Sequence, residues 1–301
     1  MSCHSTIRWV AAGLATIMAA CTDAPTHPLP PTAPQLDAVK FWEVNASTRW
    51  NERAIGLFST RTLANGQAAA SRILTYLSIA QYRAVLAAEA GKDGPNHPSV
   101  PAAVGAASVA VLRGFFPLDV ATLEADLDAD LAAPGWPGAK NEDAASGEAI
   151  GRAVGAAALA QAATDNYLVA SPGIPPVGPG YWVSAPGTAI VRSLYGTRPF
   201  FLSSASEIRP TPPPAFGSPA FLAGLAEIRA ISDTRTPEQV AIAQQWATPT
   251  APFTAGALNL IIDELIRDHH RTEREAARIL AYANAAAFDA QIACFDAKFF
   301  Y

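Results

Sequence analysis

The chain has 301 residues, of which 50% are hydrophobic and 16% are charged, so its composition predicts a packed globular fold and excludes a disordered tail. The formal net charge of -5 excludes the broad basic surface that nucleic-acid-binding proteins carry, and no nucleic-acid partner is expected. Alanine, the strongest helix former, is abundant throughout the chain. The predicted fold class is therefore all-α, a helical bundle with long Pro-rich connections.

The first 20 residues have the pattern of a bacterial export signal. Arg8 supplies a positive charge, and the apolar stretch 9–20 is too short to span a bilayer as a mature helix. The stretch ends in Met18-Ala19-Ala20-Cys21, which resembles a lipoprotein cleavage box with Met18 in the place of the usual Leu. We therefore expect a lipoprotein-type signal peptide, lipidation of Cys21, and a membrane anchor at the periplasmic face of a bacterial membrane. A plain secretory signal, giving a periplasmic or secreted protein, is the alternative.

Residues 21–35 are rich in Pro, Thr and Ala without periodicity, and they are predicted to form an extended tether. A helical domain is expected over 36–301. Cys3 would leave with the signal and Cys21 would be acylated, so Cys294 has no partner and no disulfide is expected.

Apolar periodicity predicts four helices in the first half of the domain. The first covers 67–90 and ends before a Gly- and Pro-containing stretch. The second, 101–116, is small and apolar throughout, which indicates a buried helix that a neighbour approaches closely. The third is the acidic, amphipathic stretch 118–131. The fourth covers 146–163, with Asp143 or Ser146 as its cap.

Residues 171–219 are dense in Pro, Gly and aromatic residues, and they predict an irregular but ordered wrap over the surface.

Helices are expected again over 219–230, 237–247, 254–268 and from Thr272 to the end, where Thr272 and Glu275 match a capping box. Asp263 and Arg267 are predicted to form a surface ion pair. The apolar stripe of the third of these helices is predicted to be Leu258, Ile261, Ile262 and Leu265. The core-facing residues of the last are predicted to be Ala281, Ala285, Phe288, Ile292, Phe295 and Phe299.

No metal site is expected from the spacing of the acidic and histidine residues. The adjacent pair His269-His270 would point about 100° apart on a helix, so we interpret it as solvated histidines near a helix end. Asp126, Asp128 and Asp130 would fan around a helix axis rather than line a calcium loop. The sequence contains no P-loop, dinucleotide fingerprint or nucleophile elbow. The residues alone predict only an exported or lipid-anchored helical domain.

Three segments resemble the superfamily of vanadium-dependent haloperoxidases and type-2 phosphatidic acid phosphatase-like enzymes. The first is the Pro-rich passage 209–215 with 217–221, ahead of a helix. The second, Arg235-Thr236-Pro237-Glu238-Gln239 continuing to Trp246, is similar to the family's Arg-Thr-x-Glu-Gln segment. The third, 286–301, is similar to the helix that carries the family's first oxyanion-binding pair, a Lys followed seven places later by Arg-Pro. Lys298 matches that lysine.

The resemblance implies phosphate ester hydrolysis or vanadate-dependent halide oxidation, with Lys298 as a phosphate- or vanadate-binding residue. A small phosphate ester, or a halide and peroxide, would be the substrates, and vanadate the possible cofactor of the complete enzyme. The matching arginine would lie four residues beyond Tyr301, and the later family motifs are absent from the sequence. We therefore expect the front portion of such an enzyme, incomplete at its C-terminus, without a cofactor of its own and inactive alone.

Plainer interpretations stand beside these. Lys298 can be a snorkelling lysine near a chain end, and Asp289 is interpreted as a buried or supporting hydrogen-bonding group. Arg235 is interpreted as a residue that begins a helix and pairs with local carboxylates or backbone, and Trp246 as a core residue. For the whole chain, the alternative is a non-enzymatic, lipid-anchored helical scaffold protein.

Overall fold

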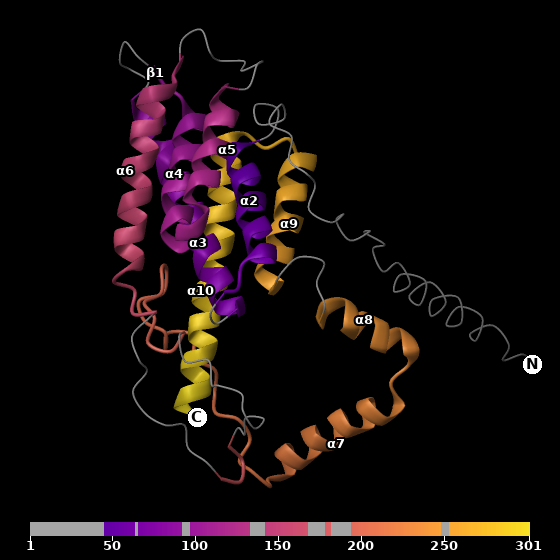
Figure 1. Ribbon diagram of the computed structural model, residues 1–301. Coiled ribbons are helices and arrows are strands. Elements are labelled where there is room, and N and C mark those ends of the chain that lie inside the picture. The colour runs from indigo at the N-terminus through magenta and orange to yellow at the C-terminus, as the bar shows by residue number, and fades with distance from the viewer. Residues whose placement is uncertain are drawn as a thin grey trace, which may run out of the picture. The chain divides into compact units, whose positions relative to one another are not determined.

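The computed structural model describes residues 45–63, 66–91, 97–132, 142–167, 178–181, 194–247 and 253–301. Within these ranges the chain forms nine α-helices, one short 3-10 helix and a parallel pair of two-residue strands (Figure 1). The predicted all-α fold is confirmed. The expected signal peptide over 1–20, the tether over 21–35 and the lipidation site Cys21 lie outside the described residues.

The helices follow the predicted order, with one addition before the first of them. The sequence did not predict α2, and every other expected helix is present within a few residues of its predicted bounds. The elements are α2 (Ala46–Thr60), α3 (Gly66–Ala90), β1 (His97–Pro98), α4 (Val100–Phe115), η2 (Pro117–Asp119), α5 (Val120–Ala132), β2 (Glu142–Asp143), α6 (Ala144–Ala162), α7 (Pro219–Thr234), α8 (Pro237–Ala247), α9 (Phe253–Asp268) and α10 (Glu273–Phe300).

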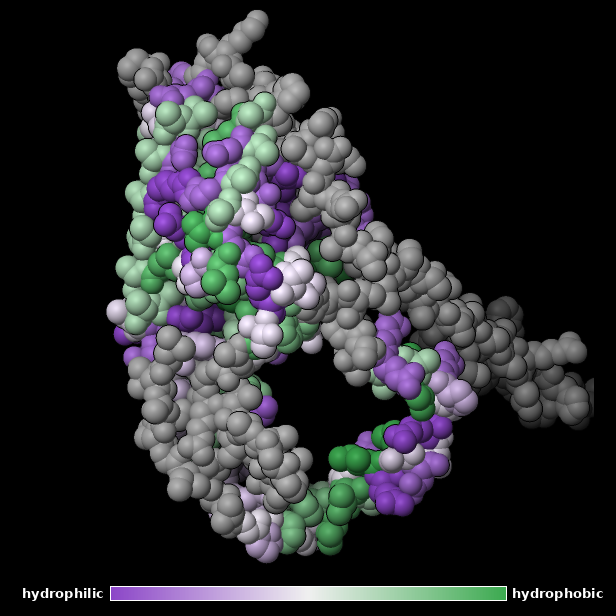
Figure 2. Space-filling view, in the orientation of Figure 1, coloured by the Kyte–Doolittle hydropathy of each residue, from purple (hydrophilic) through white to green (hydrophobic). Residues whose placement is uncertain are grey.

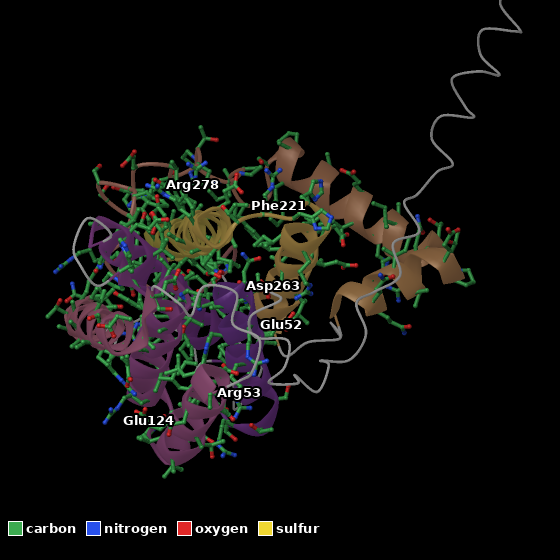
Figure 3. All side chains as sticks on the ribbon, turned by 90° about the horizontal axis from the view of Figure 1, so that it is seen from above. Glu52, Arg53, Glu124, Phe221, Asp263 and Arg278 are labelled. Carbon is green, nitrogen blue, oxygen red and sulfur yellow. The ribbon has the colours of Figure 1, made fainter. Side chains whose placement is uncertain are left out.

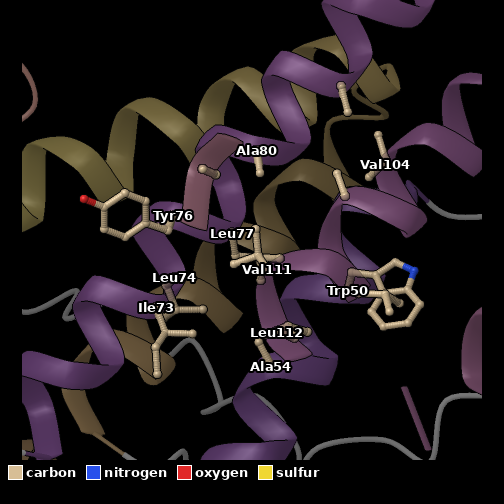
Figure 4. Close-up of a cluster of buried hydrophobic side chains, with 14 of the residues drawn as sticks. Trp50, Ala54, Ile73, Leu74, Tyr76, Leu77, Ala80, Val104, Val111 and Leu112 are labelled. Carbon is tan, nitrogen blue, oxygen red and sulfur yellow. The ribbon is translucent and has the colours of Figure 1, made fainter. Parts of the chain in front are cut away.

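Helix α3 lies at the centre of the bundle, where it packs against α2, α4, α6, α9 and α10. Its apolar face contributes Tyr76 and Leu77 to a core that also contains Trp50 from α2 and Leu112 from α4 (Figure 4). All four side chains are almost completely buried. The bundle is therefore built around a single long helix that the sequence predicted almost to the residue.

Helices α4 and α6 approach each other so closely that side chains are excluded from part of their interface. Gly147, Gly151 and Gly155 follow at four-residue spacing along the inner face of α6. A Cβ atom at Gly151 would collide with the carbonyl oxygen of Ala103, and one at Gly155 would lie 2.5 Å from the Cβ of Ala110. The prediction that the small residues of 101–116 allow close helix approach is confirmed.

The first turn of α2 is capped from the far end of the chain. The carboxylate of Glu273 accepts hydrogen bonds from the backbone N–H groups of Ala46 (2.6 Å) and Ser47 (3.0 Å). Burial raises the pKa of Glu273, whereas the hydrogen bonds from Ser47 and Ala46 lower it. Asn45, the residue before α2, makes no cap with its own side chain, so Glu273 satisfies N–H groups that a helix start leaves free.

One prediction for α9 is wrong and another holds only in part. Of the predicted stripe, Ile261 and Ile262 are half-buried but Leu258 and Leu265 are 44% and 51% exposed, and the buried face of the helix also carries Asn259 and Asp263. Asp263 is fully buried and accepts a hydrogen bond from Asn51, while Arg267 pairs with Glu52. Asp263 and Arg267 therefore do not form the predicted surface pair.

The polar face of α9 is buried because other helices supply its partners. Asn259 and Asn284 of α10 exchange two side-chain hydrogen bonds of 2.8 and 2.9 Å. Burial of paired amides of this kind costs little free energy, whereas burial of an unpaired amide would destabilise the fold.

Helix α10 follows its prediction closely. Thr272 and Glu275 form the predicted capping box. The predicted core face is buried at Ala281, Ala285, Phe288 and Ile292, and half-buried at Phe295 and Phe299.

Helix α7 is different, because none of its residues is buried. Its N-terminus is capped by Ser218, whose hydroxyl accepts a hydrogen bond from the Phe221 N–H. Figure 2 shows hydrophobic side chains on its surface, and those of Leu222, Leu225, Ile228 and Ile231 are all more than half exposed. Within the described residues no helix is long and apolar enough to cross a membrane.

Candidate functional site

The resemblance points to the C-terminal end of α10, where Lys298 lies in the last turn. The side chain is exposed, and its ammonium nitrogen lies 4.7 Å from the centre of the Phe295 ring, one turn earlier in the same helix. A cation over an aromatic face gains a modest electrostatic attraction while staying in contact with water. Lys298 is therefore a solvent-facing cation held against its own helix.

The first and third of the resembling segments meet in the structure. Arg209 donates a hydrogen bond of 2.7 Å from Nε to Asp296 of α10, and its guanidinium lies 3.7 Å from the centre of the Phe300 ring. The hydroxyl of Tyr301 donates to the backbone oxygen of Pro210 at 2.7 Å. The Pro-rich passage is thus fastened to the last turn of α10, next to Lys298. Separate motif matches did not predict this contact.

Asp289 fixes a second part of the same irregular region. Its carboxylate is buried and accepts hydrogen bonds from the backbone N–H groups of Phe200, Phe201 and Leu202, at 2.7, 2.6 and 3.1 Å. The interpretation of Asp289 as a buried hydrogen-bonding group is confirmed. The described part of the predicted surface wrap is ordered in this way.

The second resembling segment forms the start of a helix. Thr236 and Gln239 exchange hydrogen bonds in the manner of a capping box: the Thr236 N–H donates to the Gln239 side chain, and the Gln239 N–H donates to the Thr236 hydroxyl. Arg235 is exposed and ends α7, so it does not begin a helix as we expected. The side chain of Trp246 lies outside the described residues. The described part of this segment therefore has a local structural explanation.

A buried charge cluster that no sequence pattern indicated lies elsewhere in the bundle. Arg72 of α3 donates to Asp165 at 2.8 Å and to the backbone oxygen of Ala162 at 2.6 Å, with Tyr167 stacked 4.6 Å below its guanidinium. Tyr76 also donates to Asp165 at 3.0 Å. Burial, followed by the charge of Asp165, raises the pKa of Tyr76. Arg72, Tyr76 and Asp165 pair with one another, so this charge cluster is structural, while the buried hydroxyl of Tyr167 has no hydrogen-bond partner among the described residues.

The interpretation of His269 and His270 as solvated histidines near a helix end is confirmed. His269 and His270 are exposed at the end of α9, where the His269 ring contacts the backbone oxygen of Leu265. Across the described ranges, no three His, Cys, Asp or Glu side chains come together as metal ligands would. Asp130 is buried against Arg49, and Asp126 pairs with Arg53, so the acidic run of α5 serves ion pairs. Cys294 is an exposed free thiol.

A solved structure shares this fold. The crystal structure described as the first bacterial vanadium-dependent iodoperoxidase matches 85% of this chain and 69% of its own, with a TM-score of 0.67 and 19% sequence identity. The chain has the vanadium haloperoxidase fold. No family model matches the sequence, and neither does any curated protein. The resemblance read from the three segments is therefore confirmed for the fold.

The described residues do not by themselves fit a vanadate ion. An oxyanion with this charge density is held by several fixed cations and hydrogen-bond donors. Lys298 offers one cation, and Arg209 is occupied by Asp296, whose own negative charge opposes a bound anion. Among the described residues, the haloperoxidase fold carries one cation that matches the family motif, Lys298, and no complete oxyanion centre.

Proposed function

We propose that this chain is the helical front portion of an oxyanion-handling enzyme with the vanadium haloperoxidase fold. Its chemistry would be phosphate ester hydrolysis or vanadate-dependent halide oxidation, and Lys298 would supply one of the cations. The observation that carries the proposal is the fold shared with the iodoperoxidase over 85% of the chain. The motif match at Lys298 adds to it.

The setting of Lys298 suits this role. Asp289 ties the middle of α10 to residues 200–202, and the Arg209–Asp296 pair ties its last turn to the Pro-rich passage. A cation on a helix anchored at two points needs little reorganisation when an anion arrives. Lysine acts there as a compact point charge that places no demand on the anion's orientation.

We also propose that the chain is inactive alone, because one exposed lysine cannot surround a phosphate or vanadate ion. Further cations, and the group that attacks or coordinates the reacting atom, would come from another polypeptide segment. The exposed apolar residues of α7 provide a surface that such a segment could cover.

The first experiment is a calorimetric titration of the purified chain with vanadate and, separately, with phosphate. Weak binding is expected that is lost in Lys298→Ala and kept in Lys92→Ala, a matched lysine elsewhere in the sequence. Equal binding by all three proteins would remove Lys298 from the proposal. Turnover of a phosphate ester, or of iodide with peroxide and vanadate, by the chain alone would overturn the proposed inactivity.

The alternative, a non-enzymatic scaffold, is favoured by one observation. Arg209, Asp296 and Phe300 satisfy one another, as a purely structural clamp would. Absence of any vanadate or phosphate binding by wild type, together with normal folding, would support this alternative.

We further propose that the protein is exported and anchored through Cys21, as the cleavage-box pattern suggests. Expressed in a bacterium, wild type should fractionate with membranes, and Cys21→Ser should not. Cys294→Ser, which changes an exposed thiol near the other end of the sequence, is the matched control and should stay with the membranes. A membrane-bound Cys21→Ser protein would contradict the lipid anchor, and a soluble wild type would favour the plain secretory signal.

A further inference from the structure

A buried amide and a buried carboxyl group meet between α2 and α9. Asp263 is 0% exposed and Asn51 is 1% exposed. The Asn51 Nδ2 atom donates a hydrogen bond of 2.7 Å to Oδ2 of Asp263. Figure 3 labels Asp263 on α9 and, on α2, Glu52, which follows Asn51 in the chain.

The two remaining oxygens of this pair are both without a partner. Oδ1 of Asn51 and Oδ1 of Asp263 are buried atoms with no hydrogen bond to any described residue. Both are acceptors if the carboxyl group is ionised, so neither could satisfy the other. One proton on the carboxyl group changes this, because a carboxylic acid donates one hydrogen bond while its second oxygen still accepts.

The nearby cation is already occupied. Arg267, one turn further along α9, pairs with Glu52 of α2 instead of with Asp263. Burial raises the pKa of Asp263 well above its ordinary value, and the negative charge of Glu52 adds to this, whereas the Asn51 hydrogen bond and Arg267 lower it. Helices α3 and α10 also pack against α9. None of their described residues adds a charge that shifts the pKa of Asp263 beyond the effects of Glu52 and Arg267.

We propose that Asp263 is a neutral carboxylic acid in the folded protein and donates its proton to Oδ1 of Asn51. The two side chains then form a ring of two hydrogen bonds that joins α9 to α2 and satisfies both orphaned oxygens. Loss of the proton opens the ring and leaves an unpaired negative charge between the two helices. The contact between α2 and α9 therefore weakens as pH rises.

The sign of the pH effect follows from proton linkage. The unfolded chain releases this proton near the ordinary aspartate pKa of about 3.9, while the folded protein keeps it to a higher pH. The stabilisation is fully present below the unfolded pKa and is lost as pH rises toward the folded pKa. In that window, one such group raises the unfolding equilibrium constant about tenfold for each pH unit.

The experiment compares urea unfolding of the full chain and of Asp263→Asn from about pH 5 to about pH 9. The substitution keeps both hydrogen bonds, because the new amide donates to Asn51 Oδ1 and accepts from Asn51 Nδ2. We expect the unfolding equilibrium constant of wild type to rise, relative to that of Asp263→Asn, by up to tenfold per pH unit. Glu273 and Asp130, whose pKa values burial also raises, are present in both proteins, so the difference isolates Asp263.

Asp128→Asn is the matched control, because Asp128 is exposed on α5, and its profile should run parallel to wild type. Parallel profiles of wild type and Asp263→Asn would overturn the proposal.

A second measurement decides the matter if Asp263→Asn does not fold. The aspartate carboxyl carbons of wild type can be followed by NMR as pH rises from neutral. One carboxyl group should be protonated at neutral pH, and its resonance should shift in Asn51→Ser. The absence of any protonated carboxyl that responds to Asn51→Ser would overturn the proposal.

Discussion

Helices α10 and α7 have similar N-terminal caps but lie in different environments. Each begins after a hydroxyl-bearing cap, Thr272 for α10 and Ser218 for α7, whose side chain accepts a backbone hydrogen bond. Each also carries regularly spaced apolar residues. Yet α10 buries ten of its residues and α7 buries none. Local signals are therefore enough to place a helix along the chain, but they do not say whether anything packs on it.

The difference has an energetic meaning. A helix of 16 residues such as α7 is marginal in water by itself, because most helical stability in proteins comes from packing of the apolar face. The same substitution should thus have a large effect in the bundle and a small one on α7.

The largest contrast is expected for isoleucine. Ile292 of α10 is fully buried, whereas Ile228 of α7 is 68% exposed. Ile292→Ala should lower the free energy of unfolding by about 3 kcal/mol, through lost burial and the cavity left behind. Ile228→Ala should change it by less than about 0.5 kcal/mol. Urea unfolding followed by circular dichroism measures both, and equal losses would mean that something covers α7 in solution.

A smaller contrast is expected for glycine. Gly151→Ala forces a methyl group against the backbone of α4 and should cost roughly 1–3 kcal/mol of unfolding free energy. Gly224→Ala on α7 meets no atom within 4 Å, so it should stabilise that helix by up to about 1 kcal/mol through helix propensity alone. Hydrogen exchange of α7 amides, beside urea unfolding, separates the local from the global effect. A tolerated Gly151→Ala would show that α4 and α6 can move apart at little cost.

The smallest contrast concerns the two caps. Thr272→Ala and Ser218→Ala each remove a cap worth about 1 kcal/mol of helix stability. Thr272→Ala should lower the global free energy of unfolding, because α10 is part of the core. Ser218→Ala should speed hydrogen exchange in the first turns of α7 and leave global unfolding unchanged. A global loss in Ser218→Ala would show that α7 folds together with the bundle.

The sequence predicts this fold where apolar periodicity and caps agree. Residues 67–90 and 237–247 and the capping box at Thr272 follow from local patterns, and the structure has all three. Helix α2 was not predicted because its buried residues include Ser47, Asn51 and Glu52. These polar residues interrupt the apolar periodicity that predicts a helix. Burial of such residues depends on partners more than 200 positions away, including Asp263 and Glu273.

The same reason explains the errors in α9 and the incomplete view of the candidate site. The apolar stripe of α9 was visible locally, but the polar partners Asn51 and Asn284 that bury its other face were not. Lys298 was found through motif resemblance, whereas the clamp formed by Arg209 and Asp296 could not be read from either segment alone. Long-range polar pairing leaves no periodic trace in a sequence.

Because Glu273 caps α2, the first turn of α2 can be completed only late in the synthesis of the chain. The two hydrogen-bond partners of Glu273 lie 226 and 227 positions earlier in the chain. A ribosome adds roughly 5–20 residues per second, so the start of α2 waits on the order of ten seconds or more for its cap to be made. Throughout that interval the nascent helix has free N–H groups at its first turn and lacks α10. The first described helix, α2, is thus among the last to be completed during synthesis of the protein.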